Sequence, residues 1–432
     1  MAINKVVYGQ NTLIDLAGDT ATAADVAQGK YFHLATGERV QGTATGGGGT
    51  GGVTQDQDGY IVLDDEAPPG APTLITKTIT ENGTYAAEDD SADGYSEVTV
   101  NVSGGGSGSG DLKALVERTA TTQLTFPSDL TAVGAYAFYE YSSLAITSLP
   151  NNVTIIDSYA FFNCTNLALT SLPSSLTSIR NDAFRGCEKL AITNLPSGVT
   201  DIGINAFYNC ERISLTSLPS GVTSIGGSAF SGCSGIYLTE LPVGITSLEA
   251  YVFTDCYNIA LTSLPSGVRT IGNYAFARCA SLISITSNGT ITSIGTNSFV
   301  GNSSHPMQLE SVSFPNAALG GYLGTAFGST TAANACQHLE FCDLGTSYGL
   351  GSNAFANCYS LSTLVLRRPS VAVLGNVSAL LNTPMRGYNG LTGTVYVPSA
   401  LISSYQTATN WSTLYNDGTV TFVAIEGSEY EL

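Results

Sequence analysis

Charged residues are scarce in this chain, at 11% of 432 residues, against the usual quarter. Basic residues are scarcer still: 15 face 34 acidic ones, which leaves a net charge of -19. Binding to a phosphate backbone needs a basic stripe, so the composition argues against a nucleic-acid partner. Glycine, serine, threonine and asparagine take the place of the charges, which is typical of extracellular and virion proteins.

Long apolar runs are also missing. No stretch of 18 apolar residues occurs, so we expect no membrane insertion. The first residues, MAINKVVYGQNTLIDLAGD, have no apolar core behind a basic end and predict no secretory signal peptide. The chain is then expected to be cytosolic, trimmed, or exported by another route.

The sequence lacks the motifs that carry catalysis. There is no H-E-x-x-H or phosphate-binding loop, and the three histidines lie in unrelated contexts. A glycosidase needs two placed carboxylates, whereas Glu188, Glu211, Glu240 and Glu249 occupy variable positions on separate repeats. We therefore expect a protein that is not an enzyme and has no catalytic residues and no cofactor.

One acidic turn, from Asp56 to Asp65, is similar to a calcium-binding loop. Thr54 stands where the first carboxylate belongs, and no glutamate closes the loop. A plain acidic turn is the favoured interpretation and no metal site is predicted, although cation binding at this turn stays open.

Two glycine-rich stretches divide the chain, because such composition is typical of flexible linkers. The predicted organisation is a head over 1–45, a linker over 46–52, a small β-module over 53–103, a linker over 104–110, a capping helix over 111–125, regular repeats over 126–302, irregular repeats with inserted loops over 303–392, and a C-terminal cap over 393–432.

The regular part repeats with a period of 23 residues. Leucine, proline, isoleucine and phenylalanine all keep this phase, and the averaged unit is L-x-L-T-S-L-P-S-G-V-T-S-I-G-x-x-A-F-x-x-C-x-x. The phenylalanines are Phe138, Phe161, Phe184, Phe207, Phe230, Phe253, Phe276 and Phe299. A unit this short cannot bury its own apolar side, so the repeat predicts stacked coils that share one core.

The predicted fold class is therefore a β-rich solenoid with parallel β-ladders and short helical or 3-10 turns, preceded by two small modules on glycine-rich linkers. The alternating L-x-L-T-S-L segment predicts the main strand and V-T-S-I a second short extended segment. The A-F-x-x-C segment predicts a helical or 3-10 turn. About ten coils are expected, because Phe327 and Phe355 continue the motif more loosely.

Cysteine follows the same period, which indicates a repeat position and not a zinc pattern. We expect a ladder of small, buried, reduced thiols. Disulfides between neighbouring coils are conceivable by distance but are not required. The ladder cysteines are Cys164, Cys187, Cys210, Cys233, Cys256 and Cys279.

The last segment changes character and predicts a cap for the open end of the core. Ser399 to Thr409 is expected to form a short helix capped by Ser399, with Leu401, Ile402 and Tyr405 on one face. Trp411, the single tryptophan, is expected to plug the terminal coil.

Candidate binding residues are the aromatic side chains at variable positions near the A-F motif. Tyrosine gives amphipathic contact area at low entropic cost, although these rings could equally stack on each other to stabilise the ladder. The inserted segments 302–346 and 367–390, with Arg367, Arg368 and Arg386, are rival sites. The aromatic candidates are Tyr136, Tyr139, Tyr159, Phe162, Tyr208, Tyr251, Tyr257 and Tyr274.

At these residues the body resembles the BspA-type leucine-rich repeat family, through the motif S-I-G-x-x-A-F-x-x-C-x-x-L and the tail V-Y-V-P-S-A-L-I-S-S-Y-Q-T-A-T-N-W. The resemblance covers about residues 125 to 425 and implies a surface protein that binds a host or cell-surface partner. The segments TLIDLAGDTATAADVAQGK and ITENGTYAAEDDSADGYSEVTVNV are similar to parts of tail or fibre proteins in phages and prophages of Gram-positive gut bacteria.

Together these resemblances predict a tail-associated receptor-binding protein on a phage or prophage virion, assembled in the host cytoplasm. Its partners would be a host glycan or protein and, through the head, other tail proteins, with a homo-oligomer conceivable. A bacterial cell-surface adhesin is the first alternative, and a purely structural tail component is the second.

Overall fold

The computed structural model describes residue 126, residues 130–142 and residues 144–432, and the backbone of ten strands nearer the N-terminus. Of the segment 111–125, where a capping helix is expected, only Leu124–Thr125 is described, and it is a strand; of the acidic turn at 56–65 only the strand Ile61–Val62 is described. The ten strands are β1 (Ile3–Tyr8), β2 (Asn11–Asp15), β3 (Tyr31–Leu34), β4 (Arg39–Gln41), β5 (Gly52–Gln55), β6 (Ile61–Val62), β7 (Leu74–Ile79), β8 (Tyr85–Ala86), β9 (Gly94–Val100) and β10 (Leu124–Thr125).

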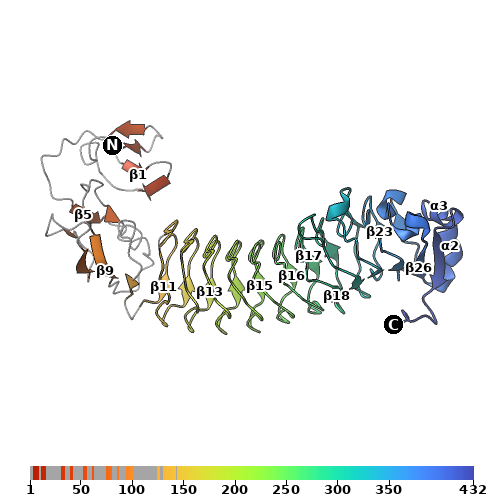
Figure 1. Cartoon of the computed structure of the whole chain (residues 1–432), viewed down its shortest axis with the longest axis horizontal. Coiled ribbons are helices and arrows are strands. Elements are labelled where there is room, and N and C mark those ends of the chain that lie inside the picture. The colour runs from red at the N-terminus through yellow and green to blue at the C-terminus, as the bar shows by residue number, and fades with distance from the viewer. Residues whose placement is uncertain are drawn as a thin grey trace.

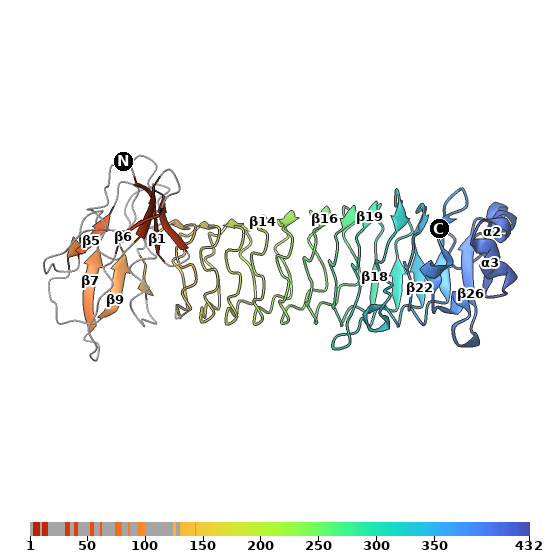
Figure 2. The same ribbon diagram turned by 90° about the horizontal axis from the view of Figure 1, so that it is seen from above.

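From residue 130 onward the chain forms one elongated solenoid, whose coils stack side by side up to the C-terminal helices (Figures 1 and 2). It is a parallel β-solenoid of about 12 turns with few helices, slightly longer than the ten coils expected. We number the coils by their ladder phenylalanine, so that Phe138 marks coil 1 and Phe299 marks coil 8.

Each regular coil contributes one two-residue strand, and these strands pair in parallel with the same residues of the neighbouring coil in two sheets, one over coils 1 to 5 and one over coils 6 to 8. Ile156 pairs with Ile179, and Ile179 with Ile202, so the register repeats every 23 residues. These strands are β11 (Ala132–Val133), β12 (Ile155–Ile156), β13 (Ser178–Ile179), β14 (Asp201–Ile202), β15 (Ser224–Ile225), β16 (Ser247–Leu248), β17 (Thr270–Ile271) and β19 (Ser293–Ile294). The looser coils that follow have a sheet of their own, with β21 (Tyr322–Leu323), β23 (Gly349–Leu350) and β25 (Val373–Leu374).

The prediction that L-x-L-T-S-L forms the main strand is wrong for the regular coils. In coil 2 the buried Leu169 and Leu172 enclose two exposed residues, a spacing of three that a strand with period two cannot keep. On this side of the solenoid a sheet starts only at Ser284, where burial alternates around Ile285. It comprises β18 (Ser284–Thr286), β20 (Ser311–Ser313), β22 (Phe341–Asp343), β24 (Thr363–Val365), β26 (Gly393–Val397) and β27 (Val420–Ala424).

The A-F-x-x-C segment is not helical either. Two residues per coil, such as Tyr159 (φ 60°) and Asn163 (φ 55°), adopt the left-handed conformation, which interrupts any helix. Alternate N–H groups then point to different coils: that of Phe161 donates to Ala183 of coil 3, whereas that of Phe162 donates to Tyr159 of its own coil. The segment is thus a run of turns in which every second hydrogen bond joins two coils.

A ladder of stacked phenylalanine rings runs through the core. Phe207 lies 5.4 Å from Phe184 and 5.5 Å from Phe230, measured between ring centroids, with 5° between the planes. Phe126 covers the first ring, Phe138, edge-on at 6.1 Å. The ladder continues through Phe327 and Phe355, so the looser coils share the same core.

The cysteine ladder is buried, and all nine cysteines are free. Each regular thiol donates to the carbonyl of the ladder phenylalanine one coil back: Cys210 Sγ lies 3.0 Å from Phe184 O. Burial raises the pKa of the Cys187 thiol well above its ordinary value, so the thiols stay protonated. The ladder thiols are thus buried, as the repeat pattern predicts.

The C-terminal segment closes the core as expected, with one difference. Tyr405 and Trp411 are fully buried, and Trp411 Nε1 donates to Ala372 O at 2.7 Å. The helix does not use Ser399 as its cap, because Pro398 holds that place without a side-chain bond. The elements here are η7 (Ser399–Leu401), α2 (Ile402–Thr407) and α3 (Trp411–Asn416), after η3 (Ala332–Asn334), η4 (Val377–Leu380), η5 (Pro384–Arg386) and η6 (Tyr388–Gly390).

Replacing a central rung of the phenylalanine ladder should be costly. Phe207→Ala leaves a cavity between two rings, and we expect a loss of about 3–5 kcal/mol in the free energy of unfolding, measured by urea denaturation followed by circular dichroism. Ile204→Ala, at a side chain 50% exposed in the same coil, should cost less than about 0.5 kcal/mol. Equal effects of the two substitutions would contradict a core built on the ladder.

The buried thiols should make stability fall at high pH. Unfolded thiols ionise above about pH 8.5, while the folded ones stay protonated, so the unfolded chain binds fewer protons. The free energy of unfolding should then decline by up to about 1.4 kcal/mol per pH unit for each thiol. Cys187→Ala should flatten this slope between pH 8 and 10, and the exposed-site control Ser214→Ala should not. An unchanged slope in Cys187→Ala would refute the effect.

Candidate functional site

Tyrosine occupies an unusual backbone position in four coils. Tyr136, Tyr159, Tyr251 and Tyr274 lie two residues before the ladder phenylalanine and have φ between 56° and 61°. Other coils place smaller residues there, including Asn205 (φ 53°). A left-handed conformation costs an ordinary side chain roughly 1–2 kcal/mol, so the tyrosines are retained against local strain. Such strain often marks functional positions.

Four of the predicted residues form one cluster on coils 1 and 2. Tyr136 stacks on Tyr159 at 4.9 Å, and Tyr139 stacks on Phe162 at 4.8 Å. The two rows also contact each other, since the centroids of Tyr159 and Phe162 lie 5.7 Å apart. Tyr136 is 51% exposed. Because the rings stack on each other, they present mainly their edges to solvent.

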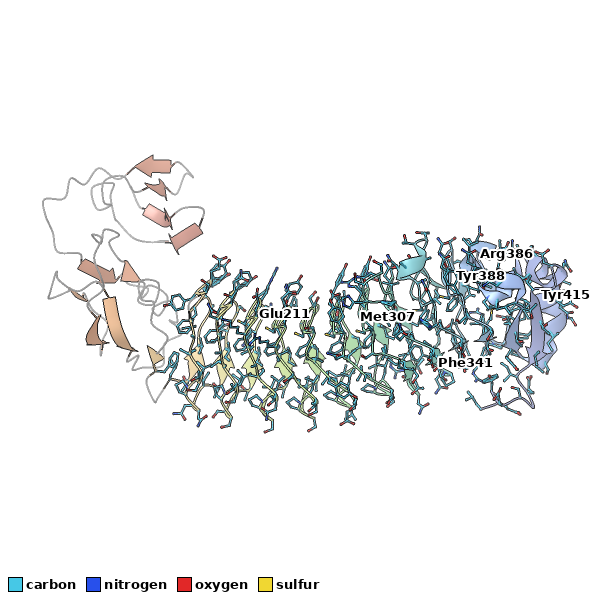
Figure 3. The ribbon with its side chains drawn as sticks, in the orientation of Figure 1. Glu211, Met307, Phe341, Arg386, Tyr388 and Tyr415 are labelled. Carbon is cyan, nitrogen blue, oxygen red and sulfur yellow. The ribbon has the colours of Figure 1, made fainter. Side chains whose placement is uncertain are left out.

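Arg185 of coil 3 extends this cluster. Its guanidinium carbon lies 5.4 Å from the Phe162 centroid and 5.0 Å from the Tyr208 centroid, which places the cation between two rings. Tyr208 of coil 4 thereby joins the same surface; Glu211, labelled in Figure 3, follows it in that coil. We call Tyr136, Tyr139, Tyr159, Phe162, Arg185 and Tyr208 the aromatic patch.

A buried carboxylate holds the patch together. Asp182 is 4% exposed and accepts hydrogen bonds from Arg185 Nη1 and Asn205 Nδ2, both at 3.1 Å. Coulombic repulsion from Asp182 raises the pKa of Tyr159, so this phenol remains a donor at neutral pH. The carboxylate therefore connects side chains from coils 2, 3 and 4.

Sequence reasoning missed Arg185, because at the variable positions near the A-F motif only aromatic residues were taken as candidates. The signal was present in the position after the ladder phenylalanine, which reads Tyr139, Phe162, Arg185 and Tyr208 in coils 1 to 4. The guanidinium is flat like the rings and completes their column.

The other three predicted residues lie apart from the patch. Tyr251 and Tyr274 form a separate stacked pair at 4.9 Å. Tyr257 stacks on His305 at 3.8 Å and donates to Asp255. The inserted residues after Phe299 thus cover Tyr257 and leave less of it for a partner.

The rival segments are not simple loops. Segment 302–346 contains β20, β21, η3 and β22, and segment 367–390 contains β25, η4, η5 and η6. Arg367 is unavailable to a ligand, since it forms an ion pair with the buried Asp343 at 2.7 Å. Arg386 pairs with Asp417, and Arg368 lies over the Tyr348 ring at 5.2 Å.

The geometry suits recognition. Rings, hydroxyls and one guanidinium are fixed on a stiff support, and such preorganised aromatic side chains bind with little loss of entropy. Among the described residues, no group of three or more histidine, cysteine or acidic side chains is placed to hold a metal ion. No helix in the same part of the chain has the length and apolarity needed to cross a bilayer.

The repeats define the class of protein as a leucine-rich repeat solenoid. The family described as "BspA type Leucine rich repeat region" matches residues 113–237, 200–323 and 238–362, which together span more than half of the chain. The chain belongs to this family. A comparison with curated proteins found no match.

Solved structures of bacterial leucine-rich repeat proteins are similar to the chain. A leucine-rich repeat protein from Bacteroides ovatus is 21% identical over 69% of this chain and 88% of that one, with a TM-score of 0.35. A leucine rich cell surface protein from Faecalibacterium prausnitzii is 18% identical over 86% and 96%, with a TM-score of 0.39. The pneumococcal vaccine antigen PcpA is 11% identical over 86% and 98%, with a TM-score of 0.31.

The strained tyrosines give a test of what they are for. Tyr159→Asn exchanges the ring for a residue that tolerates the left-handed conformation, whereas Tyr159→Ala keeps the strain and loses the ring. We expect Tyr159→Asn to unfold at a higher urea concentration than Tyr159→Ala and to lie within about 1 kcal/mol of the parent. If the alanine variant is the more stable, backbone strain is not a factor at this position.

Proposed function

We propose that this chain is a recognition protein that acts at a bacterial cell surface and holds a surface molecule of another cell on the aromatic patch. The single observation that supports this most is the patch itself, in which two strained tyrosines and a sandwiched arginine lie on a rigid family scaffold. A side chain that is retained in a strained backbone conformation must contribute something that offsets the strain, and binding of a partner is such a contribution. The family is usually non-catalytic, which agrees with this role.

The patch has the chemistry of an interface centre. Tyrosine and arginine dominate binding energetics in protein interfaces, and here they are already ordered before a partner arrives. Each solenoid coil behind them is joined to the next by hydrogen bonds on two sides. The regular core therefore serves as a support, and the variable positions select the partner.

Binding of the labelled full chain to a panel of bacterial and animal cells, followed by flow cytometry, tests the proposal. A patch variant with Tyr136→Asn, Tyr139→Ser, Tyr159→Asn and Phe162→Ser should lose at least tenfold in apparent affinity, since each buried anchor is worth about 2 kcal/mol. The matched control, Tyr251→Asn with Tyr274→Asn, removes the separate pair and should bind like the parent. If the parent chain binds no cell, or if the patch variant binds cells as well as the parent does, the proposal is wrong.

A phage tail is the second candidate location. It rests on the expected resemblance of the segment TLIDLAGDTATAADVAQGK to tail proteins, and of that segment the structure describes only the strand β2. Immunogold labelling separates the two. Gold on the outside of the producing bacterium supports the adhesin, whereas gold on induced particles, and none on intact cells, supports the tail protein.

A further inference from the structure

Arg185 is a cation whose planar faces and one nitrogen are already occupied. Phe162 and Tyr208 cover its two faces, and Nη1 donates to Asp182. In the described part of the chain, no hydrogen-bond acceptor for its Nε or Nη2 is present, and the side chain is 39% exposed. An immobilised guanidinium edge with free N–H groups therefore faces solvent.

This immobilisation is not required by the solenoid. The same position in coils 5 to 8 holds the small residues Ser231, Thr254, Ala277 and Val300, and these coils keep the same stacking. At the position after the ladder phenylalanine, large flat side chains occur only in coils 1 to 4 of the regular part. The buried Asp182, fixed in turn by Asn205, orients the guanidinium, so the edge is directed before any ligand binds.

Cations are few on this part of the solenoid. The chain carries -19 overall, yet the basic residues between positions 130 and 268 all lie in coils 3 and 4: Arg180, Arg185, Lys189 and Arg212. Lys189 is engaged with Asn166. An anionic group approaching this side of the solenoid therefore finds its best donors at Arg185, because a guanidinium edge offers two parallel N–H groups.

The backbone at the patch favours a glycan over a peptide strand. Its N–H groups are used between and within coils: Tyr159 donates to Asn181, and Phe162 donates to Tyr159. An extended peptide would find no row of free backbone partners, so side chains must make the contacts. A sugar, with hydroxyls around a ring, matches ring edges and phenol groups.

We propose that Arg185 binds the anionic group of an acidic glycan, a carboxylate or a phosphodiester, with the neighbouring rings of the aromatic patch holding the sugar. This rests on the proposed function and names its ligand class. Asp182 acts as a positioning residue, since its carboxylate orients the guanidinium and is itself too buried to meet the glycan.

A glycan array with the labelled full chain tests this. Carboxylate-bearing glycans are printed beside their carboxyl-reduced counterparts, and phosphodiester-bearing glycans beside their dephosphorylated forms. We expect binding to acidic members at least tenfold tighter than to their neutral counterparts, and the two arms tell which anion is recognised. Equal binding of the acidic and neutral forms, or of none, overturns the proposal.

Variants then assign the effect to the residue. Arg185→Gln should weaken binding of the acidic glycan about tenfold to hundredfold, the range for a lost hydrogen bond to a charged group. Arg185→Lys keeps the charge beside Asp182 but not the fork, so it should fold normally and still bind several-fold more weakly. Arg212→Gln, at an exposed arginine of coil 4, is the matched control and should bind within twofold of the parent.

Two outcomes separate this inference from the proposed function. If Arg185→Gln and Arg185→Lys both bind cells and glycans like the parent while the four-residue patch variant fails, the anion site is wrong and the recognition role stands. If the parent chain binds no cell and no glycan, both fail. Retained thermal unfolding temperatures in the variants exclude misfolding as the cause of lost binding.

Discussion

The whole structure depends on the inability of a 23-residue coil to bury its own apolar side. One coil exposes its phenylalanine, isoleucine and cysteine, and only a neighbour in the same register can cover them. Backbone hydrogen bonds join neighbouring coils at the turns as well as at the strands. Left-handed residues such as Tyr159 and Asn163 make alternate N–H groups point to the next coil. Stacking is therefore enforced on two sides of each coil.

The stacking of the coils could be predicted from the sequence, because residues that recur at the same position of each repeat are buried together in one column. Phe207 and Cys210 recur in phase, and both are fully buried in columns. The assignment of elements was less successful. Leu169 and Leu172 looked like a strand because they are apolar and close, but their spacing of three only becomes informative once burial is known. The left-handed turns left a weak signal, since asparagine, aspartate and glycine alternate there with tyrosine.

The site was only partly predictable for a related reason. Aromatic candidates could be found by type, yet proximity depends on which column each one occupies. Tyr136, Tyr139, Tyr159 and Phe162 share two adjacent columns and meet, whereas Tyr257 stands in another column and contacts His305. Arg185 became visible only as a member of a column. Reading a solenoid sequence down its columns, one coil below another, recovers contacts that reading along the chain does not.

The sandwich around Arg185 also has a consequence for how such a chain can change in length. A whole coil can be copied or removed in most of the regular part without disturbing the register, because every coil offers the same two surfaces to its neighbours. Between Phe162 and Tyr208 this freedom is absent, since one added coil would separate the guanidinium from a ring. Duplication of a coil is therefore constrained in coils 2 to 4 and not in the other regular coils, so the length of the molecule can change while the aromatic patch stays intact.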